Sequence, residues 1–433
     1  MLVIRLRSAE PGESKSEGET SHRTRRLEQA LLVTGVAALG FNLRGAITGL
    51  PPVFPELQDS LHLSTAAISV LAATPVICFG VVSGFAALLS RRLGEERVLL
   101  AALLALAAGL LLRATAPGAL LFPGTVLAAA AIAVMNVLLS SLIKRRWPER
   151  AGFLIGLYIT ALSVGAITAS LVSVPLWNGT DGSIPIDLGW LAGPAALAAL
   201  FWLPQLRHAG AATAASSPGL TLPPTARTHR VGVHRYPLAW QVTAFMGIQS
   251  LLYYAVLSWL PEILRDRGDS AGTAGDLLAL MGVGNLAVSL VVPVIAQRMR
   301  GQHALVVPTV TAMAVGLAGV VYAPLGSAVF WVLLLGAGQN AALSLAIFFT
   351  MARAPHAVAA ASLSSLAQAV GYLLASAGPL EVGLLHSATG SWNLPLAVLF
   401  VLNGILLVAG LLAARPRVLP AALTQAPEAD GGS

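Results

Sequence analysis

Residues 29–53 read QALLVTGVAALGFNLRGAITGLPPV, an apolar stretch interrupted by one charged residue, Arg44. A helix needs about 20 apolar residues to cross the hydrocarbon core of a membrane, and this stretch is long enough. The preceding residues, 1–28, are polar and lack the apolar core of a signal peptide. We therefore expect a disordered tail at 1–28, followed by a membrane span that the mature protein keeps.

The composition of the whole chain agrees with a membrane protein. Of 433 residues, 56% are hydrophobic and 10% are charged, and the mean hydropathy is +0.78. A soluble chain is about 25% charged, because it needs a polar surface, so soluble enzyme folds are excluded. The one cysteine, Cys78, lies in an apolar run, which excludes an intrachain disulfide. We expect no metal site, because no Cys and His residues have metal-ligand spacing.

The same pattern of apolar stretches recurs along the chain, and we predict twelve membrane-spanning helices. An all-α integral membrane protein is therefore the expected fold class. The expected spans are 29–53, 66–89, 97–115, 119–143, 151–175, 189–204, 238–260, 276–297, 304–323, 328–351, 358–386 (broken by Gly378-Pro379) and 393–414.

Lysine and arginine collect in alternate loops, as they do when cytoplasmic loops retain positive charge. Because they fall between apolar stretches, the excess of 26 basic over 19 acidic residues does not indicate nucleic acid. Only Arg113, Arg265 and Arg267 fall on the far side. We predict a multi-pass protein of the cytoplasmic membrane with both termini in the cytoplasm.

A long loop divides six spans from six. Residues 205–237 are rich in Ala, Ser and Pro, which is typical of a flexible linker. Each half contains a weak echo of the other: Pro55-Glu56-Leu57 corresponds to Pro261-Glu262-Ile263. Two related halves with a site between them are a common plan for secondary transporters. The expected regions are the tail 1–28, a six-helix bundle at 29–204, the linker 205–237, a six-helix bundle at 238–414 and a cytoplasmic tail at 415–433.

Ionisable groups inside membranes are expensive, so Arg44 is a functional candidate. Its guanidinium stays protonated and presents a planar fork of donors that suits a small anion. The alternatives are that Arg44 pairs with Glu381 or binds backbone carbonyls. Glu381 is the only carboxylate that we place within a span, and it could carry protons, form a gate with Arg44, or reach water at the outer end near His386.

Uncharged polar residues in several spans predict a polar cavity. Buried amides and phenols need partners, which they find on other helices or in a wet cavity. Their mixture suits a small, flat, polar ligand. The candidate lining residues, besides Arg44, are Asn42, Asn136, Tyr158, Gln249, Tyr253, Gln339, Gln368 and Tyr372.

Enzyme chemistry finds no support in the spans, which lack a Ser/His/Asp set or paired carboxylates. The chain also lacks a GxxxxGK[ST] phosphate loop, which argues against ATP-driven pumping. We therefore expect neither catalysis nor a cofactor.

Several stretches resemble one known family. They are Asn42-Leu43-Arg44, Cys78-Phe79-Gly80, Gly156-Leu157-Tyr158, Gln249-Ser250-Leu251-Leu252-Tyr253-Tyr254, and the run from Ala367 to Leu374. On these residues the chain is similar to the cyanate permease and 2-nitroimidazole transporter family of the major facilitator superfamily. Two positions depart from that pattern: Gly45 stands where the family usually has Pro, and Glu381 where an apolar residue is common.

The resemblance implies twelve helices in two pseudo-symmetric bundles and secondary transport of small or flat polar solutes. It also implies that the loop charges Arg91, Arg92 and Arg97 serve an inner gate, for which a simple topology signal is an equal alternative. The implied partners are a small-molecule solute and the lipid bilayer, with coupling to protons or to solute exchange left open. We expect a monomer.

Three functions remain in competition. The first is a transporter of a small anionic or flat polar solute with Arg44 as the anion contact. The second is an exporter of a heterocyclic drug or metabolite, in which aromatic side chains and Glu381 matter more than Arg44. The third is a membrane receptor with a transporter fold, which the absence of a folded signalling domain in the tails and linker disfavours.

Overall fold

The computed structural model describes residues 13–206 and 232–420, and within these ranges the secondary structure is helical throughout, with no strand. The expected all-α fold class is confirmed. In chain order the elements are α1 (Glu13–Thr48), η1 (Pro51–Val53), α2 (Phe54–Leu61), α3 (Thr65–Leu93), α4 (Glu95–Thr115), α5 (Pro117–Arg146), η2 (Pro148–Arg150), α6 (Ala151–Gly179), α7 (Ile184–Gly189), α8 (Ala192–Trp202), η3 (Leu203–Gln205), η4 (Val233–Arg235), α10 (Pro237–Asp266), α11 (Ala271–Arg298), α12 (His303–Tyr322), η5 (Leu325–Ser327), α13 (Ala328–Ala352), α14 (Ala357–Ala375), α15 (Ala377–Thr389) and α16 (Asn393–Ala413).

Eleven helical segments in the described part of the chain are long and apolar enough to cross a membrane. The helix α11 occupies the place of the remaining predicted span. It has 28 residues, of which Ala271–Val283 form a shorter apolar segment.

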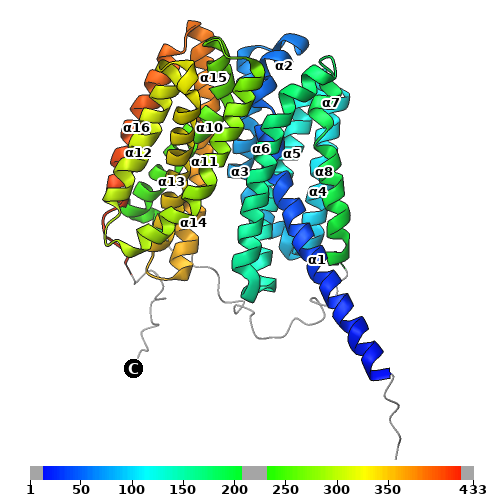
Figure 1. The fold of residues 1–433 in the computed structure, drawn as a ribbon. Coiled ribbons are helices and arrows are strands. Elements are labelled where there is room, and N and C mark those ends of the chain that lie inside the picture. Colours follow the sequence, from blue (N-terminus) through cyan, green and yellow to red (C-terminus); the bar gives the residue numbers. More distant parts are fainter. Residues whose placement is uncertain (1–12, 207–231, 421–433) are drawn as a thin grey trace, which may run out of the picture.

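The helices form two groups, which Figure 1 shows side by side. One group contains the helices of the first half of the chain, in blue to green, and the other contains those of the second half, in green to red. The short helices α2, α7 and α15 lie at one end of the molecule, and the first turns of α1 extend from the other (Figure 1). We call these the α2 end and the α1 end.

Each group is held together by helices whose backbones nearly touch. A Cβ at Gly165 of α6 would lie 2.0 Å from the carbonyl oxygen of Phe41 in α1. In the second group a Cβ at Gly336 of α13 would lie 2.4 Å from the carbonyl oxygen of Met281 in α11. Small residues allow such close approach in membranes, where helix association depends on packing. Each group is thus tightly packed within itself.

Three expectations about helix ends need correction or detail. The helix α1 begins at Glu13, so residues 13–28 are helical and not a disordered tail. Their Glu, Lys and Arg residues favour helix, and the apolar span continues it. The span predicted at 189–204 begins earlier, at Ile184, and consists of two helices, α7 and α8. The predicted break near Gly378-Pro379 is confirmed: it falls at Ser376, which leaves Pro379 in the first turn of α15, where proline is tolerated.

Other expectations fall on residues for which no structure is described. These are residues 1–12 of the N-terminal tail, 207–231 of the linker and 421–433 of the C-terminal tail.

Candidate functional site

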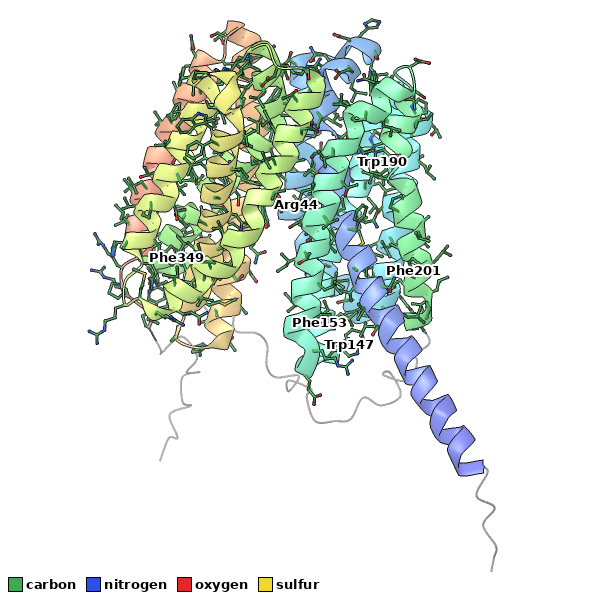
Figure 2. All side chains as sticks on the ribbon, in the orientation of Figure 1. Arg44, Trp147, Phe153, Trp190, Phe201 and Phe349 are labelled. Carbon is green, nitrogen blue, oxygen red and sulfur yellow. The ribbon has the colours of Figure 1, made fainter. Side chains whose placement is uncertain are left out.

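Arg44 lies between the two groups of helices at mid-height of the molecule, as Figure 2 shows. Its guanidinium carbon is 5.0 Å from the centre of the Tyr253 ring, close enough for a cation–π interaction. The other groups that interact electrostatically with it are also phenols, those of Tyr158, Tyr254 and Tyr372. Among the described residues no carboxylate forms an ion pair with Arg44. Its positive charge is therefore not neutralised by an acidic side chain from the described part of the chain.

Two adjoining cavities share Arg44 and Tyr253 as wall residues. The first holds about 360 Å³ of space not filled by atoms and lies between α1, α6, α10 and α11. The second holds about 370 Å³ and lies between α1 and the helices α10, α13 and α14. Both volumes include space that is open to solvent. The first is also lined by Thr48, Ser163, Ala166, Ile167, Ser170, Leu257, Leu278, Ala279, Met281 and Gly282, and the second by Gln249, Ser250, Tyr254, Gln339, Asn340, Leu343 and Tyr372.

The second cavity brings together four of the residues expected from the sequence besides Arg44: Gln249, Tyr253, Gln339 and Tyr372. The Gln249 amide donates to the Ser250 hydroxyl at 2.7 Å. The Tyr372 ring lies 5.8 Å from that of Phe79 on α3, so its position depends on both groups of helices. This wall therefore carries phenols, amides and one guanidinium.

Asn136 and Tyr158 form a pair of their own. The Tyr158 hydroxyl donates to Asn136 Oδ1 at 2.9 Å, and the Asn136 amide donates to the carbonyl of Ile132 at 3.2 Å. Neither residue lines the two cavities, but the charge of Arg44 acts on the Tyr158 hydroxyl. The pair links α5 to α6 beside the cavity.

The structure puts Asn42 and Gln368 elsewhere. Asn42 is buried, and its amide donates to the carbonyls of Ala38, at 2.8 Å, and of Pro194 in α8, at 3.2 Å. It thus joins two helices of one group. Gln368 is exposed, and its amide donates to the Ser364 hydroxyl of its own helix at 2.8 Å.

Glu381 lies on α15 at the α2 end and is partly buried. No ion pair joins Glu381 to Arg44 in the part of the chain that the structure describes. Of the alternatives raised by the sequence, the direct pair with Arg44 is therefore not formed in this conformation.

At the α2 end, the two groups of helices are tied together by an ion pair that the sequence did not predict. Arg265 Nη1 of α10 donates to Glu56 Oε1 of α2 at 2.8 Å. Beneath it, the buried rings of Phe54 and Trp259 lie 6.4 Å apart, and the Trp259 indole donates to the carbonyl of Pro379 at 2.9 Å. We call these residues the α2-end closure. The only sequence signal for it was the echoed Pro-Glu pair, which contains Glu56.

At the α1 end, Arg92 and Arg97 are exposed, and the side chain of Arg91 lies outside the described set. The ion pair found here joins Arg145 of α5 to Glu95 of α4 at 3.0 Å. Both helices belong to the same group. This pair therefore fastens neighbouring helices within one half.

Arg113 and Asp187 are two buried charged residues near the α2 end. Arg113 was expected at the far-side end of the span 97–115; it is 3% exposed, and its Nε donates to the carbonyl of Leu188 at 3.2 Å. It interacts electrostatically with Asp187 of α7, which is 6% exposed. The expectation that Glu381 is the only carboxylate within a span is therefore wrong. The reason is that the short helix α7 extends the span predicted at 189–204 back to Ile184, so this span includes Asp187.

Metal binding finds no basis in the described ranges, where no three His, Cys, Asp or Glu side chains come together as a metal site needs.

Comparison with known proteins gives a consistent result. Residues 30–379 match the model of the Major Facilitator Superfamily. The chain is 37% identical over 396 residues to the uncharacterized transporter YycB of Bacillus subtilis (strain 168), which covers 91% of this chain and 96% of the relative. It is 36% identical over 387 residues to the 2-nitroimidazole transporter of Escherichia coli (strain K12), covering 89% and 96%.

Two further matches are more distant. The cyanate transport protein CynX of Escherichia coli (strain K12) is 29% identical over 361 residues, covering 82% of this chain and 89% of the relative. Among solved structures, a bacterial homologue of the human lysosomal transporter Spinster superposes with a TM-score of 0.73 at 15% identity, over 91% of this chain and 99% of that one. The latter likeness concerns the fold alone.

Proposed function

Since this chain belongs to the major facilitator superfamily, we propose that it is a secondary active transporter that moves a small anionic or flat polar solute across the cytoplasmic membrane. That it is a multi-pass membrane transporter and not an enzyme follows from its family and relatives. The nature of the solute is the part that we infer from the site.

One observation carries the proposal: Arg44 faces the two cavities with no acidic partner among the described residues. A guanidinium in such a place is expensive unless an anion joins it, and its planar fork suits a carboxylate or a similar small anion. A solute that brings the negative charge would complete the site. Anions therefore gain more from this cavity than neutral molecules of the same shape.

The tyrosines favour a flat solute. Tyr253, Tyr254 and Tyr372 all line the second cavity. Aromatic rings pack against one another at centroid distances of 4.5–7 Å, so a planar solute would find partners here. This wall, together with the 36% identity to a protein named as a 2-nitroimidazole transporter, favours a second candidate, export of a neutral heterocycle.

The arrangement of the halves supports a mechanism of alternating access. The cavities lie between the two groups of helices, and the α2-end closure joins these groups on one side of the cavities. We propose that the α2 end is the outer one and that both termini are cytoplasmic. The positive-inside rule supports this orientation, because the arginines at the α2 end are engaged by the protein itself. Arg113 is buried, Arg265 binds Glu56, and Arg267 donates to the carbonyls of Val320 and Ala323.

The test is solute binding and flux with Arg44→Ala. A ligand that binds only the folded protein stabilises it by about 2.7 kcal/mol at 100 times its Kd, which raises the melting temperature. We expect small planar carboxylates to raise the melting temperature of the wild type in detergent and to leave that of Arg44→Ala unchanged. We also expect Arg44→Ala to lose flux of the same carboxylates into proteoliposomes. The matched control is Arg300→Ala, which removes an exposed arginine from the α11–α12 connection.

Two results would contradict the anion assignment. Retained flux of a stabilising anion by Arg44→Ala would show that the guanidinium is structural. Stabilisation of both proteins by neutral nitroheterocycles and by no anion would favour the second candidate.

A further inference from the structure

Gln339 of α13 is a buried amide without a partner. Its side chain is 2% exposed, and neither its nitrogen nor its oxygen has a hydrogen-bond partner. Because both atoms are unpaired, this observation does not depend on which of the two was assigned as nitrogen. The residue lines the second cavity, as Arg44 does.

The neighbouring amide does not satisfy Gln339. The Gln249 side chain donates instead to the Ser250 hydroxyl and to the sulfur of Met246, at 2.7 and 3.5 Å. A buried polar atom without a hydrogen bond costs about 1–3 kcal/mol, and Gln339 has two such atoms. An apolar residue at this position would avoid the penalty, so the amide is best explained by a group that enters the cavity.

An amide presents a donor and an acceptor side by side. It pairs with two bonds to any group that offers an acceptor and a donor at the same spacing, as glutamine does with the edge of adenine. A lactam, with its ring N–H next to a carbonyl, is such a group. A hydrocarbon ring edge offers neither atom and would leave Gln339 unpaired.

Arg44 and Gln339 face the cavity from different groups of helices, with Tyr253 and Tyr372 also in its wall. We propose that this cavity selects a planar monoanion whose uncharged edge carries a hydrogen-bond donor next to an acceptor, with Gln339 as the residue that recognises this edge. The inference rests on the proposed function, because Arg44 is taken to bind the anionic group. It adds a specificity residue and a narrower class of solute, namely anionic lactams and amides.

The experiment uses three ring carboxylates and the full-length protein in detergent. The first is a pyridone carboxylate with the lactam opposite the carboxylate, the second is its N-methyl derivative, and the third is benzoate. The N-methyl derivative and benzoate both lack the lactam N–H. Benzoate lacks it without the added bulk of a methyl group. Two hydrogen bonds of ordinary strength predict that the wild type binds the pyridone carboxylate about 30-fold more tightly than benzoate.

The variant that tests the residue is Gln339→Met, which keeps the shape of the side chain. In this variant the Kd ratio of benzoate to pyridone carboxylate should fall to about one. Removing two unpaired polar atoms should also leave the empty protein as stable as the wild type or more so, which guards against misfolding. The control is Asn403→Leu on α16, because Asn403 is also a buried amide with an unpaired oxygen but does not line the cavity. It should keep the wild-type ratio.

The outcomes separate this inference from the function it rests on. If the three carboxylates bind the wild type equally and Arg44→Ala abolishes their binding, the anion site stands and the role of Gln339 is refuted. If Gln339→Met leaves the Kd ratio of benzoate to pyridone carboxylate unchanged, the role of Gln339 is refuted as well. If none of the carboxylates binds the wild type, both the anion site and the inference fall.

Discussion

Glu56→Gln should raise the population of the state in which the α2 end is open about tenfold over the wild type. The substitution keeps a neutral hydrogen-bond acceptor beside Arg265 and removes the charge from a contact of 2.8 Å. Exposed ion pairs contribute about 0–1 kcal/mol, and breaking a buried pair costs about 3–5 kcal/mol. With side chains 19% and 26% exposed, this pair lies between those cases. A loss of about 1.4 kcal/mol corresponds to the factor of ten.

The assay is cysteine accessibility from the outer side. The single native cysteine, Cys78, is replaced by serine, and Leu257→Cys places a reporter in the wall of the first cavity. Leu257 is buried on α10, one turn beyond Tyr253. With the α2 end outermost, as proposed, a membrane-impermeant maleimide added to right-side-out vesicles reaches this position when the α2 end opens. The labelling rate therefore reports the population of the open state.

A matched control and a rescue decide the interpretation. Asp59→Asn removes an exposed carboxylate from the same helix, α2, and should leave the labelling rate unchanged. The charge-reversed double variant Glu56→Arg/Arg265→Glu should restore slow labelling. If Glu56→Gln labels at the wild-type rate, or if the double variant labels as fast as the single variants do, the pair does not hold this end closed.

Two other predictions concern packing and buried charge. A Cβ at Gly383 of α15 would lie 1.9 Å from the Ser69 hydroxyl oxygen of α3, so Gly383→Ala should separate these helices, and overpacking of this kind costs about 1–3 kcal/mol. We expect Gly383→Ala to speed the labelling of the Leu257→Cys reporter, and Ser69→Ala to reverse part of this effect. An unchanged labelling rate would mean that α15 and α3 accommodate the methyl group without opening the α2 end. Asp187→Asn should leave Arg113 buried without its acidic neighbour, at a cost below that of breaking a direct buried pair, about 3–5 kcal/mol, because no ion pair joins these two described side chains. A clear drop in melting temperature should follow, and Arg113→Leu in the same chain should recover part of it, whereas a drop that persists would refute the charge explanation.

The fold could be predicted from the sequence because each membrane span is formed by consecutive residues. Apolar runs and the loops between them require no knowledge of distant contacts, and the break in the span at 358–386 was visible from one Gly-Pro pair. The continuation of α1 back to Glu13 was missed because polar, charged residues are compatible with both a helix and a disordered segment.

The site could be predicted in part, for a related reason. A lone arginine in an apolar run is recognisable from sequence, so Arg44 could be singled out as a candidate. Hydropathy does not say which side of a helix faces a cavity, and Asn42, two residues before Arg44, faces α8 instead. Glu56 and Arg265 are 209 residues apart and lie near the ends of their spans, where charges are ordinary. Pairing between them is decided by the packing of the halves.

Under the proposed function, the charge of Arg44 also makes transport depend on the membrane voltage. An empty site carries one positive charge, and a monoanion neutralises it, so the loaded protein changes its access without moving net charge across the field. The empty protein does move charge, at about 2.3 kcal/mol per 100 mV. With the cell interior negative, the field favours the empty site facing inward. A carrier of this design would therefore export anions more readily than it imports them, unless another gradient drives the import.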